Sequence, residues 1–178
     1  MKLDRPARRA TLAVHVVAAA GWLGLTLGLL ALAITAITTD SPAMTEATVR
    51  SMKLFADWLV IPLALLTLLS GLVLSLGTPW GLARHRWVYT KFWLTLATTA
   101  ASVFALRPGV TSAAETIASG SPLVDLSDLV AGPIVSLSAY LFMTVISVLK
   151  PWGLTKRGRK HRPTSRNAVD GRGVRQTA

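Results

Sequence analysis

Three ionisable residues, His15, Asp57 and Lys91, lie within long apolar stretches of the sequence. Placing such a group in lipid is costly, so each is a candidate for function unless its side chain reaches the membrane surface. A histidine could coordinate a metal, a lysine could hold an anionic group, and an aspartate could pass protons. The surroundings of these residues therefore decide which chemistry is open to the chain.

His15 lies about one helical turn inside the first apolar stretch. Helical spacing places Ala18, Ala19, Trp22 and Thr26 on the same side. The alanines leave a recess beside the imidazole, and the tryptophan forms an aromatic wall further along the helix. This pattern fits a flat ligand coordinated by His15, and the alternative is a histidine that is hydrogen-bonded to a neighbouring helix.

Lys91 lies at nearly the same depth in the third apolar stretch, and Thr95, Thr98 and Ser102 follow it at helical spacing. A polar stripe of this kind normally faces other helices. The ammonium could hold a carboxylate at the inner end of the bundle. The alternative is that Lys91 extends to the lipid headgroups.

Asp57 belongs near the opposite membrane surface, with Lys53 four residues before it and Trp58 beside it. A local ion pair with Lys53 accounts for this carboxylate. A proton relay would need polar steps across the membrane, and residues 59–69 are almost wholly apolar. We therefore do not assign Asp57 to the candidate site.

Polar residues in the fourth apolar stretch also recur at helical spacing: Ser136, Tyr140, Thr144 and Ser147. Such residues commonly join membrane helices. Met143 lies among them and could act as a soft ligand, although methionine more often serves packing.

Four apolar stretches must position these residues. The chain has 178 residues, 52% of them hydrophobic and 15% charged, which is typical of a membrane protein. A bilayer core needs roughly 20 apolar residues per helix. We predict an all-α, four-helix transmembrane bundle with helices at about 11–38, 51–77, 88–106 and 129–150. Because there is no cysteine, disulfides and thiolate metal sites are excluded.

Basic residues indicate the orientation of the bundle. Of the 19 Lys and Arg, all but Arg50, Lys53 and Arg107 lie before the first helix, around the second turn or after the fourth helix. By the positive-inside rule both termini are cytoplasmic, and we expect a multi-pass protein of the bacterial plasma membrane. The net charge of +11 is thereby explained without nucleic acid.

The bundle is expected to occupy residues 1–155, and residues 156–178 to form a basic, disordered cytoplasmic tail. This tail either serves only as an orientation signal or also contacts anionic lipids. Residues 108–128 are expected to form an outer loop, in which Ser121 and Pro122 would cap a short extension of the fourth helix.

Motifs of soluble enzymes are missing. The sequence contains no nucleophile elbow, phosphate-binding loop, paired carboxylates or metalloprotease motif. We therefore do not expect an enzyme of these classes.

Four segments carry a family resemblance: Arg8-Arg9 ahead of His15, and residues 21–24 (GWLG), 85–91 (HRWVYTK) and 149–155 (LKPWGLT). Together they resemble a large family of bacterial four-span integral membrane proteins of uncharacterised function. The resemblance covers the chain from about Arg8 to Thr155. It implies the same topology and transfers no activity.

A more distant resemblance links the chain to the haem-carrying membrane protoporphyrinogen oxidases and to the copper-resistance D-type membrane proteins. The oxidases have a histidine on the first helix and a Trp-x-x-x-Lys-like segment at the start of the third. His15, and Trp87 with Lys91, match these features. The resemblance implies that His15 is the axial haem ligand and that Lys91 is the basic residue near the tetrapyrrole.

The chain departs from this pattern because no second histidine lies within a predicted span. His85 falls in the cytoplasmic turn and His161 in the tail. Six-coordinate haem would then need Met143, His85 on a folded-back turn, or a partner chain.

Two functions remain open, and a transporter is less favoured because the sequence indicates neither a broken helix at mid-membrane nor a charged pathway. The first is a small integral membrane protein that binds haem or another tetrapyrrole, with His15 on the iron, Lys91 paired with a propionate, Trp22 packed on the ring and Met143 nearby. The alternative is a non-catalytic membrane scaffold or partner subunit with no cofactor. A ridge of small residues (Ala20, Gly24 and Gly28) would let a helix of the bundle or a second copy of the chain approach closely.

Overall fold

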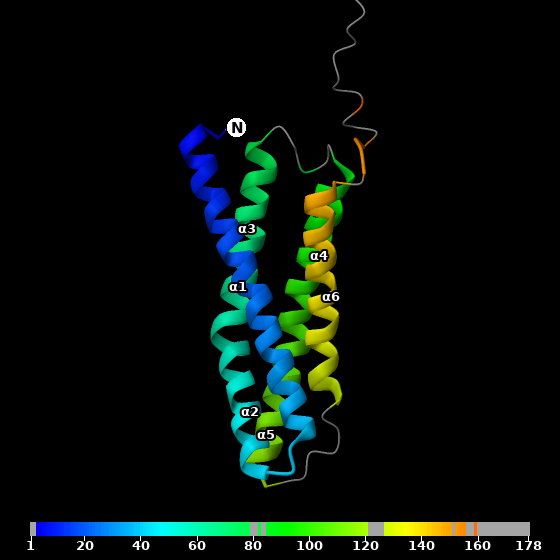
Figure 1. Ribbon diagram of the computed structural model, residues 1–178. Helices are drawn as coiled ribbons and strands as arrows, with labels where there is room; N and C mark the ends of the chain where they lie inside the picture. Colours follow the sequence, from blue (N-terminus) through cyan, green and yellow to red (C-terminus); the bar gives the residue numbers. More distant parts are fainter. Residues whose placement is uncertain are drawn as a thin grey trace, which may run out of the picture.

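In the part that the structure describes, the chain folds into helices and forms no strand. The computed structural model describes residues 3–78, 82, 85–120, 127–150, 152–155 and 159. Its elements are α1 (Arg5–Thr38), α2 (Pro42–Phe55), η1 (Ala56–Val60), α3 (Ile61–Gly77), α4 (Arg86–Ala101), η2 (Ser102–Leu106), α5 (Arg107–Ala118) and α6 (Ser127–Leu149) (Figure 1). The all-α prediction is confirmed. The predicted tail at 156–178 lies outside the described residues except for Arg159.

Three helical stretches are long and apolar enough to cross a membrane: Arg5–Thr38, Pro42–Gly77 and Ser127–Leu149. The third predicted helix, at 88–106, corresponds to α4, which at 16 residues is shorter but continues without a break into η2 and α5. The structure is thus that of a membrane protein with at least three helices of spanning length.

Local sequence explains where the first helices start. The Asp4 carboxylate accepts a hydrogen bond from the Ala7 amide at 2.9 Å and caps α1. The Ser41 hydroxyl does the same for Met44 at the start of α2, and Pro42 follows it at the first helical position. Both helices therefore begin earlier than the apolar stretches predicted.

The expectation of an outer loop at 108–128 is wrong for residues 108–118, which lie in α5 (Arg107–Ala118). Small residues hid its apolar stripe, which consists of Val110, Ala113, Ala114 and Ile117 at helical spacing and packs against the core. The predicted capping pair Ser121 and Pro122 lies outside the described residues.

Two π-helical segments interrupt the long helices, and each begins the same number of residues ahead of a proline. The first, η1, starts at Ala56 ahead of Pro62, and the second, η2, starts at Ser102 ahead of Pro108. A proline cannot donate a backbone hydrogen bond, and its ring collides with the preceding turn. The wider turn of a π segment relieves this conflict, so the helix bends and continues.

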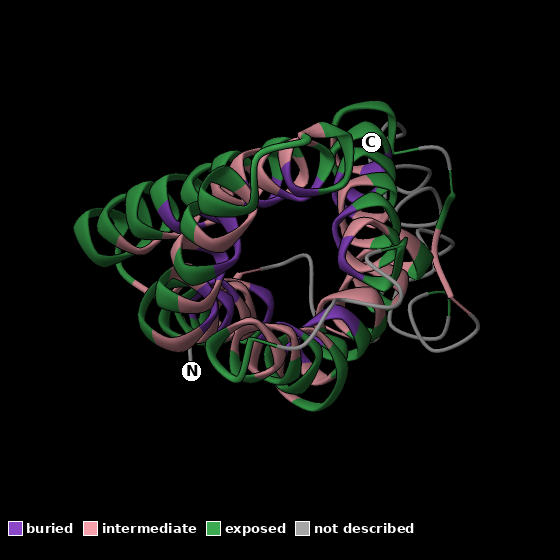
Figure 2. Ribbon diagram, turned by 90° about the horizontal axis from the view of Figure 1, so that it is seen from below, coloured by how far each residue is buried: buried purple, intermediate pink, exposed green. Residues whose placement is uncertain are grey.

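The long helices form a ring. Helix α1 contacts α2, α3 and α6, while α4 contacts α3 and α6, and α5 packs on α2. Buried positions line the inner sides of the helices (Figure 2). The start of α1 and the end of α6 lie at one end of the bundle, which we call the mouth (Figure 1). The opposite end, where α1 ends and α2 begins, is the base.

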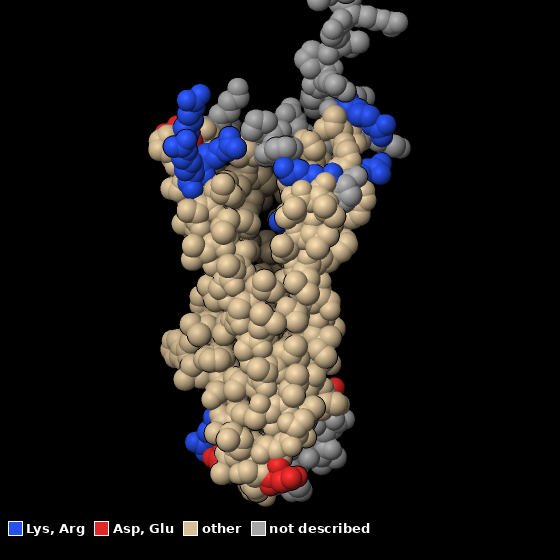
Figure 3. All heavy atoms as spheres, in the orientation of Figure 1, with Lys and Arg blue, Asp and Glu red and all other residues tan. Residues whose placement is uncertain are grey.

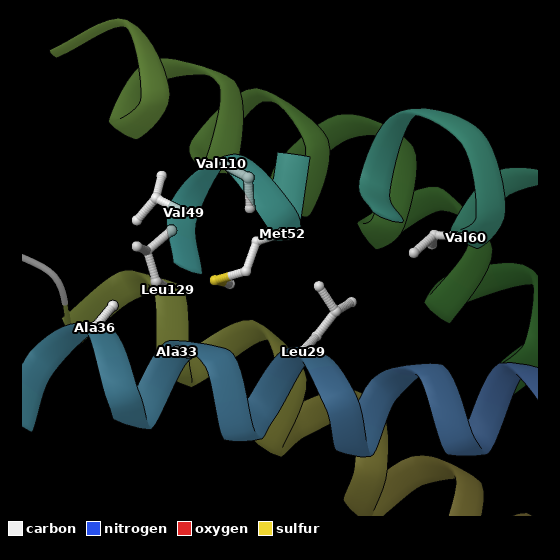
Figure 4. Packing of buried hydrophobic residues seen from close by; sticks show 8 residues of the cluster. All are labelled: Leu29, Ala33, Ala36, Val49, Met52, Val60, Val110 and Leu129. Atoms are coloured by element: carbon white, nitrogen blue, oxygen red, sulfur yellow. The ribbon is translucent and has the colours of Figure 1, made fainter. Parts of the chain in front are cut away.

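The largest apolar core fills the base. Its side chains point toward one another from α1, α2, η1, α5 and α6 (Figure 4). They are Leu29, Ala33, Ala36, Val49, Met52, Val60, Val110 and Leu129. The base is therefore tightly closed by hydrophobic packing.

The base core predicts a contrast between two leucines of α1. Leu29 is 2% exposed, whereas Leu27 is 49% exposed and faces outward. Replacing Leu29 by alanine leaves a cavity and should lower the free energy of unfolding by about 2 to 5 kcal/mol. Leu27→Ala should have a much smaller effect. Thermal unfolding of the purified variants in detergent measures both, and equal losses of stability would contradict the assignment of this core.

Candidate functional site

A cleft opens at the mouth of the bundle. The space-filling view shows the surface hollowed between the α1–α3 side and the α4–α6 side (Figure 3). Each side is held together separately at this end. The Leu3 amide donates to the Gly77 carbonyl at 3.2 Å, and the Arg86 amide to the Gly153 carbonyl at 3.5 Å. The cleft thus lies between two helix pairs that join at the base.

His15 lies on α1 and contacts α3 through its Nδ1 atom. This atom is 3.1 Å from the Thr67 carbonyl oxygen and 3.0 Å from Ser70 Oγ. A carbonyl can only accept, and Ser70 Oγ already donates its proton to the Leu66 carbonyl. His15 Nδ1 must therefore carry the proton and donate it. In the neutral ring, the Nε2 lone pair then remains for a ligand, as in histidines that bind metals.

Gly71 lets the imidazole lie directly against α3. A Cβ atom at this position would be 3.1 Å from His15 Cε1 and 3.5 Å from Nδ1. The close approach and the two hydrogen-bond acceptors fix the ring on one side. As predicted, Ala18, Trp22 and Thr26 on the same side of α1 are buried.

Lys91 points into the bundle from α4. Its half-buried ammonium donates to Ser147 Oγ on α6, and it lies close enough for its charge to act on the His15 ring. The predicted polar stripe of α4 continues inward, because Thr95 Oγ1 donates to Met143 Sδ at 3.4 Å. Lys91 therefore links α4 to α6.

The other polar residues at helical spacing on α4 and α6 also face the interior, with one exception. Thr98 and Ser102 on α4 are buried, as is Tyr140 on α6. Thr144 is exposed, so its inclusion in the inward-facing stripe of α6 is wrong.

An aromatic cluster lies deeper in the bundle than His15 and Lys91. Trp22 is 3% exposed, and its ring centroid is 4.7 Å from that of Tyr140. Met143 and Ala64 complete the cluster. The Tyr140 hydroxyl is buried near other hydroxyl groups, but none of the described residues bonds to it with good geometry. Trp22 and Met143 thus belong to one buried cluster on the base side of His15 and Lys91.

Asp57 lies away from the cleft. It pairs with Lys53 at 2.7 Å, as predicted, and also with Arg107 at 2.8 Å. The second ion pair links η1 to the start of α5 and was not foreseen. Asp57 therefore holds two helices together, which supports its exclusion from the candidate site.

The partners of His15 on α3 were missed by reasoning from the sequence. Thr67, Ser70 and Gly71 are small or polar residues within an otherwise apolar helix. This short cluster was the available signal, and the apolar character of residues 59–69 concealed it.

Ligand donors in the cleft are few. The described residues contain no group of three or more His, Cys, Asp or Glu that could hold a metal ion. A haem requires only one or two axial ligands, so this observation does not bear on it. No protein-family profile matches the chain, and neither a curated protein nor a solved structure is significantly similar to it.

The geometry predicts the tautomer of His15. In protein with ¹⁵N-labelled histidine, the neutral His15 ring should show a protonated Nδ1 and an unprotonated Nε2, with the signal assigned through His15→Gln. Gly71→Val should push the ring from its acceptors and shift both resonances. Gly24→Val is the matched control, because nothing lies within 4 Å of a Cβ built there. A neutral ring protonated at Nε2 would refute this arrangement.

Proposed function

We propose that this chain is a four-span membrane protein that binds haem or a related tetrapyrrole in the cleft. The supporting observation is the orientation of His15, whose Nδ1 is engaged by α3 while its Nε2 is left as a donor to iron. Haem bound there would supply the redox or ligand-binding chemistry. The protein would supply His15 as the axial ligand and Lys91 as a nearby cation. The apolar core would close the bundle at the base, opposite the mouth.

Charge and helix arrangement support the topology. In this proposal α4 and η2 form the fourth crossing, with α5 continuing beyond it. The start of α1 and the end of α6 share the mouth (Figure 1), where the described basic residues include Arg5, Arg8 and Arg9 at the start of α1, Arg86 at the start of α4 and Lys150 after α6. The positive-inside rule then places the mouth in the cytoplasm of a bacterial cell.

The surroundings of His15 fit an amphiphilic ligand that carries carboxylates. Lys91 is a half-buried cation that would pair with a propionate by a charge-assisted hydrogen bond, replacing or sharing its bond to Ser147. Trp22 and Met143 would form the apolar floor below the ligand. Because Met143 Sδ already accepts a bond from Thr95, we assign the iron to His15 alone.

A scaffold without a cofactor is the second candidate. The same contacts favour it, because His15 joins α1 to α3 and Lys91 joins α4 to α6. Gly24 and Gly28 face no atom of the described chain within 4 Å of a built Cβ. The small-residue ridge would in this case receive a second copy of the chain or another membrane protein.

Haem titration in detergent separates these candidates. The wild type and His85→Ala should develop a Soret band that saturates at one haem per chain, whereas His15→Ala should lose it. Lys91→Met should retain the band and weaken binding about tenfold, the scale of one charge-assisted hydrogen bond. A band unchanged in His15→Ala would remove the ligand assignment, and no band in the wild type would favour the scaffold.

Single cysteines test the orientation, because the natural chain has none. Met44 is exposed at the base and Ala7 is exposed at the mouth, so each is replaced by cysteine in a separate variant. A membrane-impermeant maleimide should label Met44→Cys in intact cells and Ala7→Cys only after lysis. The reverse pattern would overturn the proposed topology.

A further inference from the structure

An open groove of about 410 Å³ lies on the outside of the bundle, between the α2–η1 segment and α5. It is separate from the cleft, and its lining includes Asp57 and the two cations that pair with it. Its lining is Lys53, Asp57, Val103, Arg107, Pro108, Thr111, Ser112 and Glu115. Most of these side chains are polar, although the groove lies beside an apolar surface.

The two cations of the groove retain donors that Asp57 does not use. Arg107 binds Asp57 Oδ1 through Nε, and Lys53 binds Oδ2 through Nζ. Among the described residues, no further hydrogen bond is made by the Arg107 Nη atoms. A guanidinium has five N–H groups and an ammonium three, so both can hold a phosphate without releasing the carboxylate. Both side chains are also partly exposed.

The opposite end of the groove is acidic. Glu115 is exposed one helical turn beyond Thr111, which is in turn one turn beyond Arg107. With Lys53 and Asp57 included, the two positive and two negative charges of the groove balance. A ligand that is itself zwitterionic, with its anion at Arg107 and its cation at Glu115, matches this distribution better than a simple anion.

The order of groups along the helix matches that of a membrane lipid. Phe104, one turn toward the mouth from Arg107, is 80% exposed, and Trp58 beside Asp57 is 75% exposed. Such aromatic side chains are typical of the lipid-facing surface and of the membrane interface. From there toward the base, α5 presents first a cation, then hydroxyl groups, then a carboxylate.

We infer that this groove binds the headgroup of a zwitterionic aminophospholipid such as phosphatidylethanolamine. The acyl chains would lie along the surface around Phe104, and the phosphate would contact Arg107, Lys53 and the Thr111 hydroxyl. The ammonium would pair with Glu115. The site is independent of any ligand in the cleft, and it would anchor η1 and α5 at the membrane surface.

Native mass spectrometry of the full chain, delipidated in a neutral detergent, tests this inference. The probes are short-chain phosphatidylethanolamine, short-chain phosphatidylglycerol, which lacks the amine, and soluble phosphoethanolamine, which lacks the acyl chains. The wild type should prefer phosphatidylethanolamine about tenfold over the other two, the scale of one ion pair partly shielded from water. Equal binding of the two lipids, or equal binding of phosphoethanolamine, would overturn the proposal.

Variants identify the two ends of the headgroup. Glu115→Gln should weaken phosphatidylethanolamine alone and abolish the preference, and its position is exposed enough to leave folding intact. Arg107→Gln should weaken both lipids about tenfold. Arg50→Gln is the control, because Arg50 pairs with Glu46 outside the groove and is 67% exposed. An unchanged preference in Glu115→Gln would also contradict the proposal.

Discussion

A polar side chain in an apolar bundle is costly unless another helix supplies its hydrogen-bond partner, and this constraint organises the structure. Near the mouth the partners are paired across helices: His15 with Thr67 and Ser70, and Lys91 with Ser147. Near the base the interior is apolar. Hydrogen bonds of polar side chains between helices thus characterise the half that opens into a cleft, and hydrophobic packing predominates in the other half.

The two π segments lie where these halves meet. They contact one another, and each precedes a proline at the same spacing, so two long helices change direction at a common depth. Asp57 and Arg107 bind at this junction. The helices can therefore pack closely in the base and still diverge toward the mouth, which a bundle of straight helices would not allow.

Much of this arrangement could be predicted from hydropathy and spacing, because lipid leaves the backbone few alternatives to a helix. The shared side of His15 and Trp22, and the inward-facing stripe of Thr95, Thr98 and Ser102 after Lys91, followed from helical periodicity. The contacts between helices could not be predicted, since a single sequence fixes a residue's side of its own helix but not its partner on another. Helix α5 was missed for a different reason: its buried stripe is mostly alanine, and Pro108 was interpreted as a helix end although a π segment accommodates it.

The distribution of polar groups also bears on whether a polar solute could cross the bundle. The polar stripes of α4 and α6 reach from the mouth to the level of Ser102, and in the described part of the chain the interior beyond them is the apolar core around Leu29 and Met52. A polar or charged solute would lose its hydration there without gaining partners. The apolar core thus opposes passage of a polar solute from the mouth to the base, which favours a binding or anchoring function over transport across the bilayer.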